Sequence, residues 1–168
     1  MKIAIAAEVC SWELMKTVRQ HLIDSGQEVL DLGMSDAGKP CKFYETAPRV
    51  ARAIQNGQAE RGILMCGTGM GVCLVANKFQ GIYAAVAESA TTARLHWVIN
   101  RANVLCMGAW IVGPLVARDM VDAWLRAEIG EGFSEERRRV QAEGYARIQE
   151  VERENFKELK RADGRTQA

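Results

Sequence analysis

The segment from residue 62 to residue 71 limits the possible folds more than any other part of the chain. Gly62-Ile-Leu-Met65 is a short apolar run without polar alternation, as expected for a parallel strand buried on both faces. It leads directly into the loop Cys66-Gly-Thr-Gly-Met-Gly71, and a helical pattern follows to about residue 79. This order of strand, glycine-rich turn and helix is typical of an α/β protein with a parallel sheet.

The same alternation of short apolar runs and helical patterns occupies most of the chain. Strands are predicted at residues 2–7, 28–32, 62–65, 82–87 and 103–107, and helices at 12–25, 45–56, 71–79, 90–99 and from 114 onward. The predicted fold is α/β: a doubly wound, Rossmann-like sheet of five parallel strands with helices on both faces and right-handed crossovers. An extra C-terminal helix follows this sheet.

The C-terminal part has a different composition, and it sets the predicted domain boundaries. From Ser134 onward the sequence is dense in Glu and Arg, with apolar residues at helical spacing. We predict a domain at 1–130, a helical extension at 131–162 and a tail at 163–168. The extension is either a solvated amphipathic helix on its own domain or a helix that packs on a partner subunit.

Charge and cysteine usage narrow the partners and the compartment. The net charge of +1 creates no overall field, so we expect neither nucleic acid nor a membrane surface as partner. No apolar run approaches the roughly 20 residues that span a bilayer, and Met1 leads into the first strand without a signal peptide. The five cysteines lack CxxC spacing, which indicates reduced thiols, no metal site and a cytoplasmic protein.

The loop 66–71 carries the residues best suited to chemistry. Ligands of open α/β sheets bind beyond the carboxyl ends of the strands, where this loop begins. Gly67, Gly69 and Gly71 let the backbone approach a ligand, and the following helix favours an anion near its start. Cys66 would be stabilised there as a thiolate, although a buried cysteine before a tight turn is the alternative.

These residues also carry a family resemblance. The run from Met65 to Gly71 resembles the ribose-5-phosphate isomerase type B and galactose-6-phosphate isomerase family, together with further matches at Ala76-Asn-Lys78, Gly81-Ile82, Thr92-Ala-Arg-Leu95, Asn100, Ala102-Asn-Val-Leu105, Val112-Gly113 and Val121-Asp-Ala-Trp-Leu125. The resemblance covers about residues 1 to 130. It implies an aldose–ketose isomerase that works through a cis-enediolate without a metal or other cofactor.

The resemblance also implies residue roles. Cys66 matches the cysteine that moves the proton between C1 and C2, and Thr68 matches the hydroxyl beside it. The amides of Gly67, Gly69, Met70 and Gly71 match those that hold the enediolate oxygen, and Asn100 matches an asparagine that binds substrate hydroxyls. The family's site lies at a dimer interface, which implies a homodimer or tetramer with shared active sites.

Several positions depart from the family pattern. The family's Asp-His pair after the first strand is here Glu8-Val9, its histidine before the asparagine is Ile99, and its tyrosine is Phe43. Of the arginines that hold the phosphate, one is here Trp110; Arg139 matches another, but that arginine's partner four residues earlier is Glu135. The ring-opening acid and much of the phosphate clamp are therefore missing, because tryptophan and glutamate cannot replace an arginine fork. Ribose 5-phosphate and galactose 6-phosphate are not the expected substrates.

Two explanations of these departures remain open. A tetrose or tetrulose phosphate has no ring to open, and its phosphate could be bound by Arg137, Arg138 or Arg139. Alternatively, the substrate is unphosphorylated or carries a carboxylate, and Trp110 and Phe43 offer an apolar or stacking surface.

Two titratable residues are further candidates. Glu8 either shuttles a proton between substrate oxygens or serves the following helix, and His96 either returns an imidazole to the site from one turn before Ile99 or merely packs. His21 is expected to be structural.

The predicted function is therefore an aldose–ketose isomerase of a small sugar or sugar phosphate. The alternatives are a non-catalytic, site-completing subunit of a hetero-oligomeric isomerase, and a cysteine hydrolase or transferase in which His96 is the base. The predicted catalytic residues are Cys66, Thr68 and Glu8, and the predicted substrate ligands are Gly67, Gly69, Met70, Gly71, Asn100, Arg139, Phe43, His96 and Trp110.

Overall fold

The computed structural model describes residues 1–33 and 41–162, with side chains as far as residue 156. The chain divides into two compact units, Met1–Ile129 and Gly130–Ala168. The predicted tail at 163–168 lies outside the described residues.

The first unit is built on a five-stranded parallel sheet. Its strands are β1 (Lys2–Ala7), β2 (Glu28–Asp31), β3 (Arg61–Cys66), β4 (Ala84–Val86) and β5 (Val104–Gly108). They lie in the order β2-β1-β3-β5-β4, and all four pairings are parallel. The prediction of a doubly wound α/β sheet from the alternating apolar runs is confirmed.

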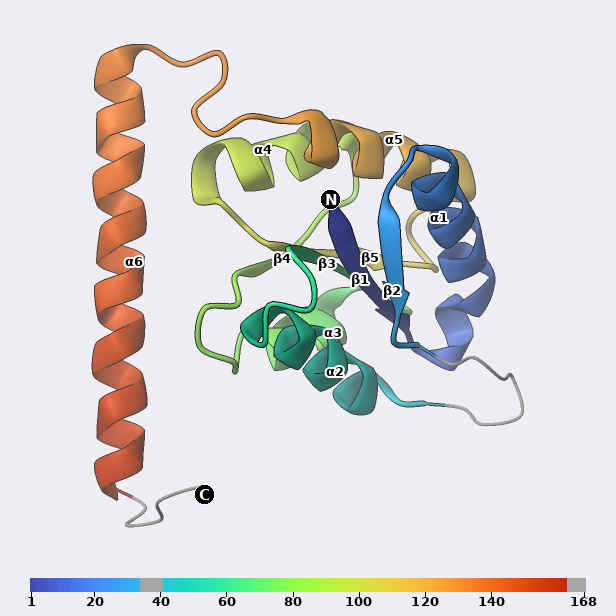
Figure 1. Ribbon diagram of the computed structural model, residues 1–168, viewed down its shortest axis with the longest axis horizontal. Coiled ribbons are helices and arrows are strands. Elements are labelled where there is room, and N and C mark those ends of the chain that lie inside the picture. The colour runs from blue at the N-terminus through green and yellow to red at the C-terminus, as the bar shows by residue number, and fades with distance from the viewer. Residues whose placement is uncertain (34–40, 163–168) are drawn as a thin grey trace. The chain divides into compact units, whose positions relative to one another are not determined.

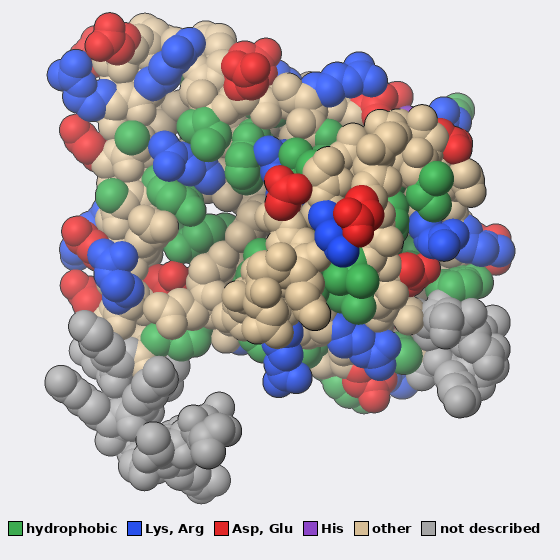
Figure 2. Space-filling model, in the orientation of Figure 1, with side chains coloured by type: hydrophobic (Ala, Val, Ile, Leu, Met, Phe, Trp, Pro, Cys, Tyr) green, Lys and Arg blue, Asp and Glu red, His purple; other side chains and the backbone are tan. Residues whose placement is uncertain are grey.

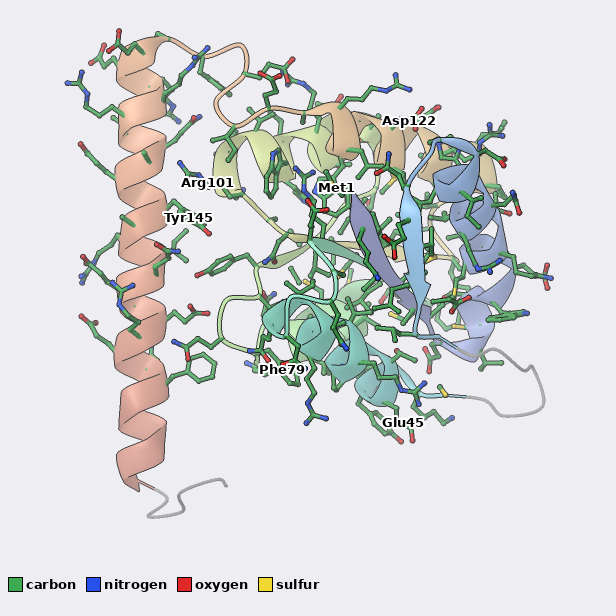
Figure 3. All side chains as sticks on the ribbon, in the orientation of Figure 1. Met1, Glu45, Phe79, Arg101, Asp122 and Tyr145 are labelled. Carbon is green, nitrogen blue, oxygen red and sulfur yellow. The ribbon has the colours of Figure 1, made fainter. Side chains whose placement is uncertain are left out.

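Helices cover both faces of this sheet (Figure 1). After the short helix η1 (Val9–Ser11) come α1 (Trp12–Asp24), α2 (Phe43–Gln55), α3 (Met70–Ala76), α4 (Ala90–Asn100) and α5 (Pro114–Arg126). Helices α1, α4 and α5 share one apolar core with the sheet, and α2 and α3 share the other. Figure 3 shows Asp122 on α5, where its Oδ1 lies 2.7 Å from Nε2 of His21 on α1.

The central strand β3 is buried along its whole length, including one charged residue. The Arg61 guanidinium stacks on the ring of Trp97 at 3.4 Å from the centroid and donates a hydrogen bond to the Trp124 carbonyl. Burial lowers the pKa of Arg61 to about 10, so the side chain keeps its charge at neutral pH. The aromatic neighbours stabilise the buried cation in place of the water that burial removes.

The edge strand β4 is shorter than the predicted strand 82–87. The Ala84 N–H donates to Asn77 Oδ1, and Asn77 Nδ2 donates to the Ala84 carbonyl, both at 2.8 Å. The Tyr83 N–H donates to Asn103 Oδ1. These side chains occupy backbone groups that a longer or additional strand would use. The helix expected to reach residue 79 ends at Ala76 for the same reason, since Asn77 turns towards Ala84.

The second unit contains one long helix, α6 (Glu135–Ala162). Acidic and basic side chains are interspersed along it, at the left of Figure 2. Arg147 Nη1, for example, lies 2.7 Å from Glu150 Oε2, and the apolar residues Val140, Ile148 and Val151 are exposed. In the described part of the chain, no helix is long and apolar enough to cross a membrane.

Candidate active site

The strand order places a topological switch point between the carboxyl ends of β1 and β3. The chain leaves β1 towards the α1 face and leaves β3 towards the α3 face, so neighbouring strands send their helices to opposite sides. Ligands of open α/β sheets bind at such a switch point. The residues that border it are Glu8, which directly follows β1, and Cys66, which ends β3; the Glu8 N–H donates to the Met65 carbonyl at 2.9 Å.

Cys66 is the last residue of β3, where the loop begins, and it is only 4% exposed. Its Sγ accepts a hydrogen bond from the Gly69 N–H at 3.2 Å, and the Thr68 hydroxyl accepts one from the Met70 N–H at 3.3 Å. Within the described residues, the N–H groups of Thr68 and Gly71 have no acceptor. The loop therefore offers a thiol and unused backbone donors, which can stabilise an oxyanion formed beside the sulfur.

The loop is held against β5 by close backbone contacts. The Ala109 N–H donates to the Cys66 carbonyl at 3.0 Å, which extends the pairing of β3 and β5 beyond the strands. A Cβ at Gly108 would lie 2.5 Å from the Thr68 carbonyl carbon, and one at Gly69 would lie 2.9 Å from that of Met107. Gly69 also has a φ of 79°, which favours glycine. These glycines are required by packing and by backbone conformation.

Two aromatic side chains bracket the loop. A Cβ at Gly67 would lie 2.7 Å from the ring of Trp110, and one at Gly71 would lie 3.0 Å from the ring of Phe43. Trp110 is 71% exposed and Met70, the first residue of α3, is 55% exposed, so both reach solvent at this loop. The structure thus brings Trp110, Phe43, Met70 and the three loop glycines together around Cys66.

Glu8 has a neighbour that the sequence interpretation did not single out. The Cys10 thiol donates to Glu8 Oε2 at 3.6 Å. Burial, above all, raises the pKa of Cys10, a hydrogen bond with Ser11 partly opposes this, and the charge of Glu8 and the proximity of Cys66 raise it further. Cys10 is therefore within electrostatic reach of Cys66 and remains a thiol. Its position just beyond the first strand was the only sequence signal for this proximity.

Asn100 lies at the opposite end of the sheet from Cys66. Helix α4 runs back from the carboxyl edge, and Asn100 ends it just before the amino end of β5. At the usual rise per residue, the amino and carboxyl ends lie about 13 Å apart in β5 and about 17 Å apart in β3. Figure 3 shows Arg101, the residue after Asn100, and Glu45, in the first turn of α2, on opposite sides of the first unit. Asn100 and Cys66 of one chain do not meet.

His96 is also remote from Cys66. It lies beside Val86 of β4, which is two strands or about 10 Å away from β3. Burial lowers the pKa of His96, a backbone contact with Val86 partly opposes this shift, and Nδ1 is buried without a partner among the described atoms. His21 is bound to Asp122. Neither histidine can act on Cys66 within one chain, which argues against a cysteine hydrolase.

The remaining predicted ligand, Arg139, belongs to the second unit. It lies on α6 with Nη2 3.9 Å from Glu135 Oε1, and its side chain is exposed. In residues 1–33 and 41–162, no three His, Cys, Asp or Glu side chains gather as metal ligands would.

The fold and the residues at the switch point define a class of enzyme. A thiol and a carboxylate at neighbouring strand ends, with free amides in the loop that follows the thiol, suit the transfer of a proton between neighbouring carbons through an enediolate. The chain belongs to the ribose/galactose isomerase family, whose model matches residues 3–142. It is an aldose–ketose isomerase.

Individual relatives agree with this class. The chain is 41% identical to the 4-deoxy-4-sulfo-D-erythrose isomerase of Clostridium sp. (strain MSTE9), over 80% of this chain and 85% of that protein. It is 37% identical to the D-erythrulose-4-phosphate isomerase of Pectobacterium atrosepticum, over 80% and 88%. The solved ribose-5-phosphate isomerase B of Clostridium thermocellum superposes with a TM-score of 0.83 at 34% identity, covering 92% of this chain and 99% of that one.

Proposed function

We propose that the substrate is a four-carbon aldose or ketose with a phosphate or sulfonate at its terminal carbon. Such a sugar lacks a free hydroxyl at C4, so it cannot close a five-membered ring. An enzyme that binds it needs no ring-opening acid. The observation that carries this is that Val9 and Ile99 stand where the family has histidines. Within one chain, neither His21 nor His96 replaces them beside Cys66. Two relatives with four-carbon substrates in their names support the same class.

In the proposed reaction Cys66 is the base. Its thiolate removes the proton from C2 of the aldose, and the electron pair forms the C1–C2 double bond of an enediolate. The free N–H groups of Thr68 and Gly71 hold the oxygen on which negative charge develops. Glu8 moves a proton between the two oxygens, and Cys66 returns its proton to C1 to give the ketose. The net change is a proton shift, which requires no redox cofactor.

The test is isomerisation in D2O, followed by proton NMR. Purified protein is incubated with D-erythrose 4-phosphate and, separately, with 4-deoxy-4-sulfo-D-erythrose. We expect conversion to the ketose with loss of a carbon-bound proton signal. Cys66→Ala should lower the rate by about 10²–10⁴-fold, the range for loss of a general base. Folded protein that converts neither sugar, or a Cys66→Ala variant with full activity, would refute the proposal.

We further propose that the working site is shared between two copies of the chain. Asn100 lies too far from Cys66 of its own chain to touch the same small substrate, so a second copy would supply it. Mixing inactive Cys66→Ala with inactive Asn100→Ala should then restore activity at about a quarter of the sites, because half the dimers carry one intact site of two. A mixture that exchanges subunits but stays inactive contradicts sharing.

Arg139 is proposed as a ligand of the terminal anion. Its guanidinium is exposed and 3.9 Å from Glu135, beyond hydrogen-bonding distance, so it is free to form paired hydrogen bonds to phosphate or sulfonate. Arg139→Met should raise KM more than it lowers kcat. Arg147→Met is the matched control, since Arg147 already pairs with Glu150 at 2.7 Å. Equal KM values for the two variants would remove Arg139 from the site.

The extension at 131–162 is proposed to pack on the second copy. Val140, Ile148 and Val151 are exposed along α6 and offer an apolar stripe for such a contact. A chain ending at residue 130 should form assemblies of fewer copies in light scattering than the full chain, while an unchanged number of copies argues for a solvated helix. We also place the protein in the cytoplasm, where its five free cysteines would stay reduced.

A further inference from the structure

A hollow lies next to the active-site loop but is separated from it by one side chain. The hollow measures about 490 Å³ and opens to solvent between the start of α1 and the segment that joins β5 to α5. Its lining includes Cys10, Glu13 and Thr17 on one side and Trp110, Ile111 and Val112 on the other. Cys66 and Gly67 do not line it.

Trp110 stands at the boundary between this hollow and the loop. Its N–H donates to the Gly67 carbonyl at 2.9 Å, which fixes its backbone beside the residue that follows Cys66. Its ring covers Gly67 so closely that a Cβ there would lie 2.7 Å from ring carbons Cε3 and Cζ3. The same side chain is a wall of the hollow. Trp110 therefore forms a partition with the reaction space on one side and unused volume on the other.

Other parts of the loop are packed against the fold: Gly69 abuts Met107 and Gly108, and Gly71 abuts Phe43. Past Trp110, in contrast, lies the volume of the hollow, which a longer substrate with its reacting carbons at Cys66 would use. The far side of the partition suits sugar carbons, because Thr17 and Glu13 offer hydroxyl partners.

We infer that Trp110 is the specificity-determining residue that limits the substrate to four carbons, because its ring closes the passage from Cys66 to the hollow. This inference rests on the proposed function. One additional carbon in a closed pocket costs about 10–200-fold in kcat/KM. Removal of the ring joins the two spaces and relieves that cost.

The test compares D-erythrulose 4-phosphate with D-ribulose 5-phosphate in the wild-type protein, Trp110→Ala and Trp110→Phe. We expect the ratio of kcat/KM for the five-carbon substrate to that for the four-carbon substrate to rise at least about 10-fold in Trp110→Ala, with Trp110→Phe in between. Since Trp110 is 71% exposed, its replacement leaves the core intact, and the melting temperature should stay near the wild-type value. Ile111→Ala is the control, because Ile111 lines the same hollow and is 54% exposed.

The outcomes separate this inference from the proposed function. A wild-type protein active on the four-carbon substrate, with the same ratio in Trp110→Ala and Ile111→Ala, overturns the inference and leaves the proposed function standing. A ratio that rises equally in both variants also overturns it. A wild-type protein inactive on both D-erythrulose 4-phosphate and 4-deoxy-4-sulfo-D-erythrose overturns both.

Discussion

Gly69 offers a direct test of how tightly the loop 66–71 is held. It has a φ of 79°, and a Cβ there would lie 2.9 Å from the carbonyl carbon of Met107 and 3.1 Å from the backbone nitrogen of Gly108. Substitution by alanine therefore meets two separate costs, a left-handed backbone and a collision with backbone atoms of a central strand. Neither atom belongs to a flexible side chain that could move aside.

The two costs can be worked out separately. A left-handed conformation costs an L-residue about 1–2 kcal/mol. Overpacking against a rigid neighbour adds about 1–3 kcal/mol. Gly69→Ala should therefore lower the free energy of unfolding by about 2–5 kcal/mol in total. Gly57→Ala is the matched control, because Gly57 has a φ of 68° and nothing lies within 4 Å of its added Cβ; it should lose only the first cost.

The assay is urea unfolding followed by circular dichroism, with isomerase activity measured on the same samples. Because the Gly69 N–H donates to Cys66 Sγ at 3.2 Å, any shift of the loop should also lower kcat in Gly69→Ala, whereas Gly57→Ala should keep wild-type activity. Equal losses of stability in the two variants would show that the crowding against β5 carries no energy, and the reasoning would fail.

Three further predictions concern the sheet and its helices. Asn77→Ala removes both hydrogen bonds to the Ala84 backbone and should cost about 1–3 kcal/mol in urea unfolding; a wild-type midpoint contradicts this. Burial lowers the pKa of His96, so the unfolded chain binds the proton more tightly, and stability should fall as the pH drops below 6.5. The His96→Gln variant should show a shallower fall between pH 8 and pH 5, and an identical slope excludes His96 as its source. Arg61→Lys loses the planar stack on Trp97 and should lower the free energy of unfolding by about 1–2 kcal/mol; thermal unfolding at the wild-type temperature would count against the stack.

The strands of the core could be predicted because their sequence pattern is local. An unbroken apolar run such as Gly62–Met65 reports burial on both faces, and the structure has β3 there with one more residue at each end. The length of β4 could not be predicted, because it depends on Asn77 and Asn103, whose side chains bind the backbone of residues 83 and 84. Nothing near residue 84 in the sequence encodes these partners.

In the site, too, the features encoded by neighbouring residues could be predicted, and those that depend on distant residues could not. The loop from Cys66 to Gly71 could be placed at a strand end from its own residues, and its role as the reaction centre stays a prediction. The separation of His96 from Cys66 could not be foreseen, because it follows from the strand order, which puts β4 beyond β5. The separation of Asn100 follows instead from the course of α4, which ends just before the amino end of β5. The contact of Trp110 with Gly67 likewise arises only because β3 and β5 are neighbours.

The crowded glycines have a consequence for how such an enzyme can change over evolutionary time. At Gly69 and Gly108 a single additional carbon would meet backbone atoms within 3 Å, so most mutations at these positions would be lost with the fold. Trp110 and Phe43 only flank the loop and can vary in size without disturbing the backbone. New substrates would therefore be acquired by exchanging these flanking rings around an unchanged reaction centre, a route that keeps the chemistry while the range of sugars drifts.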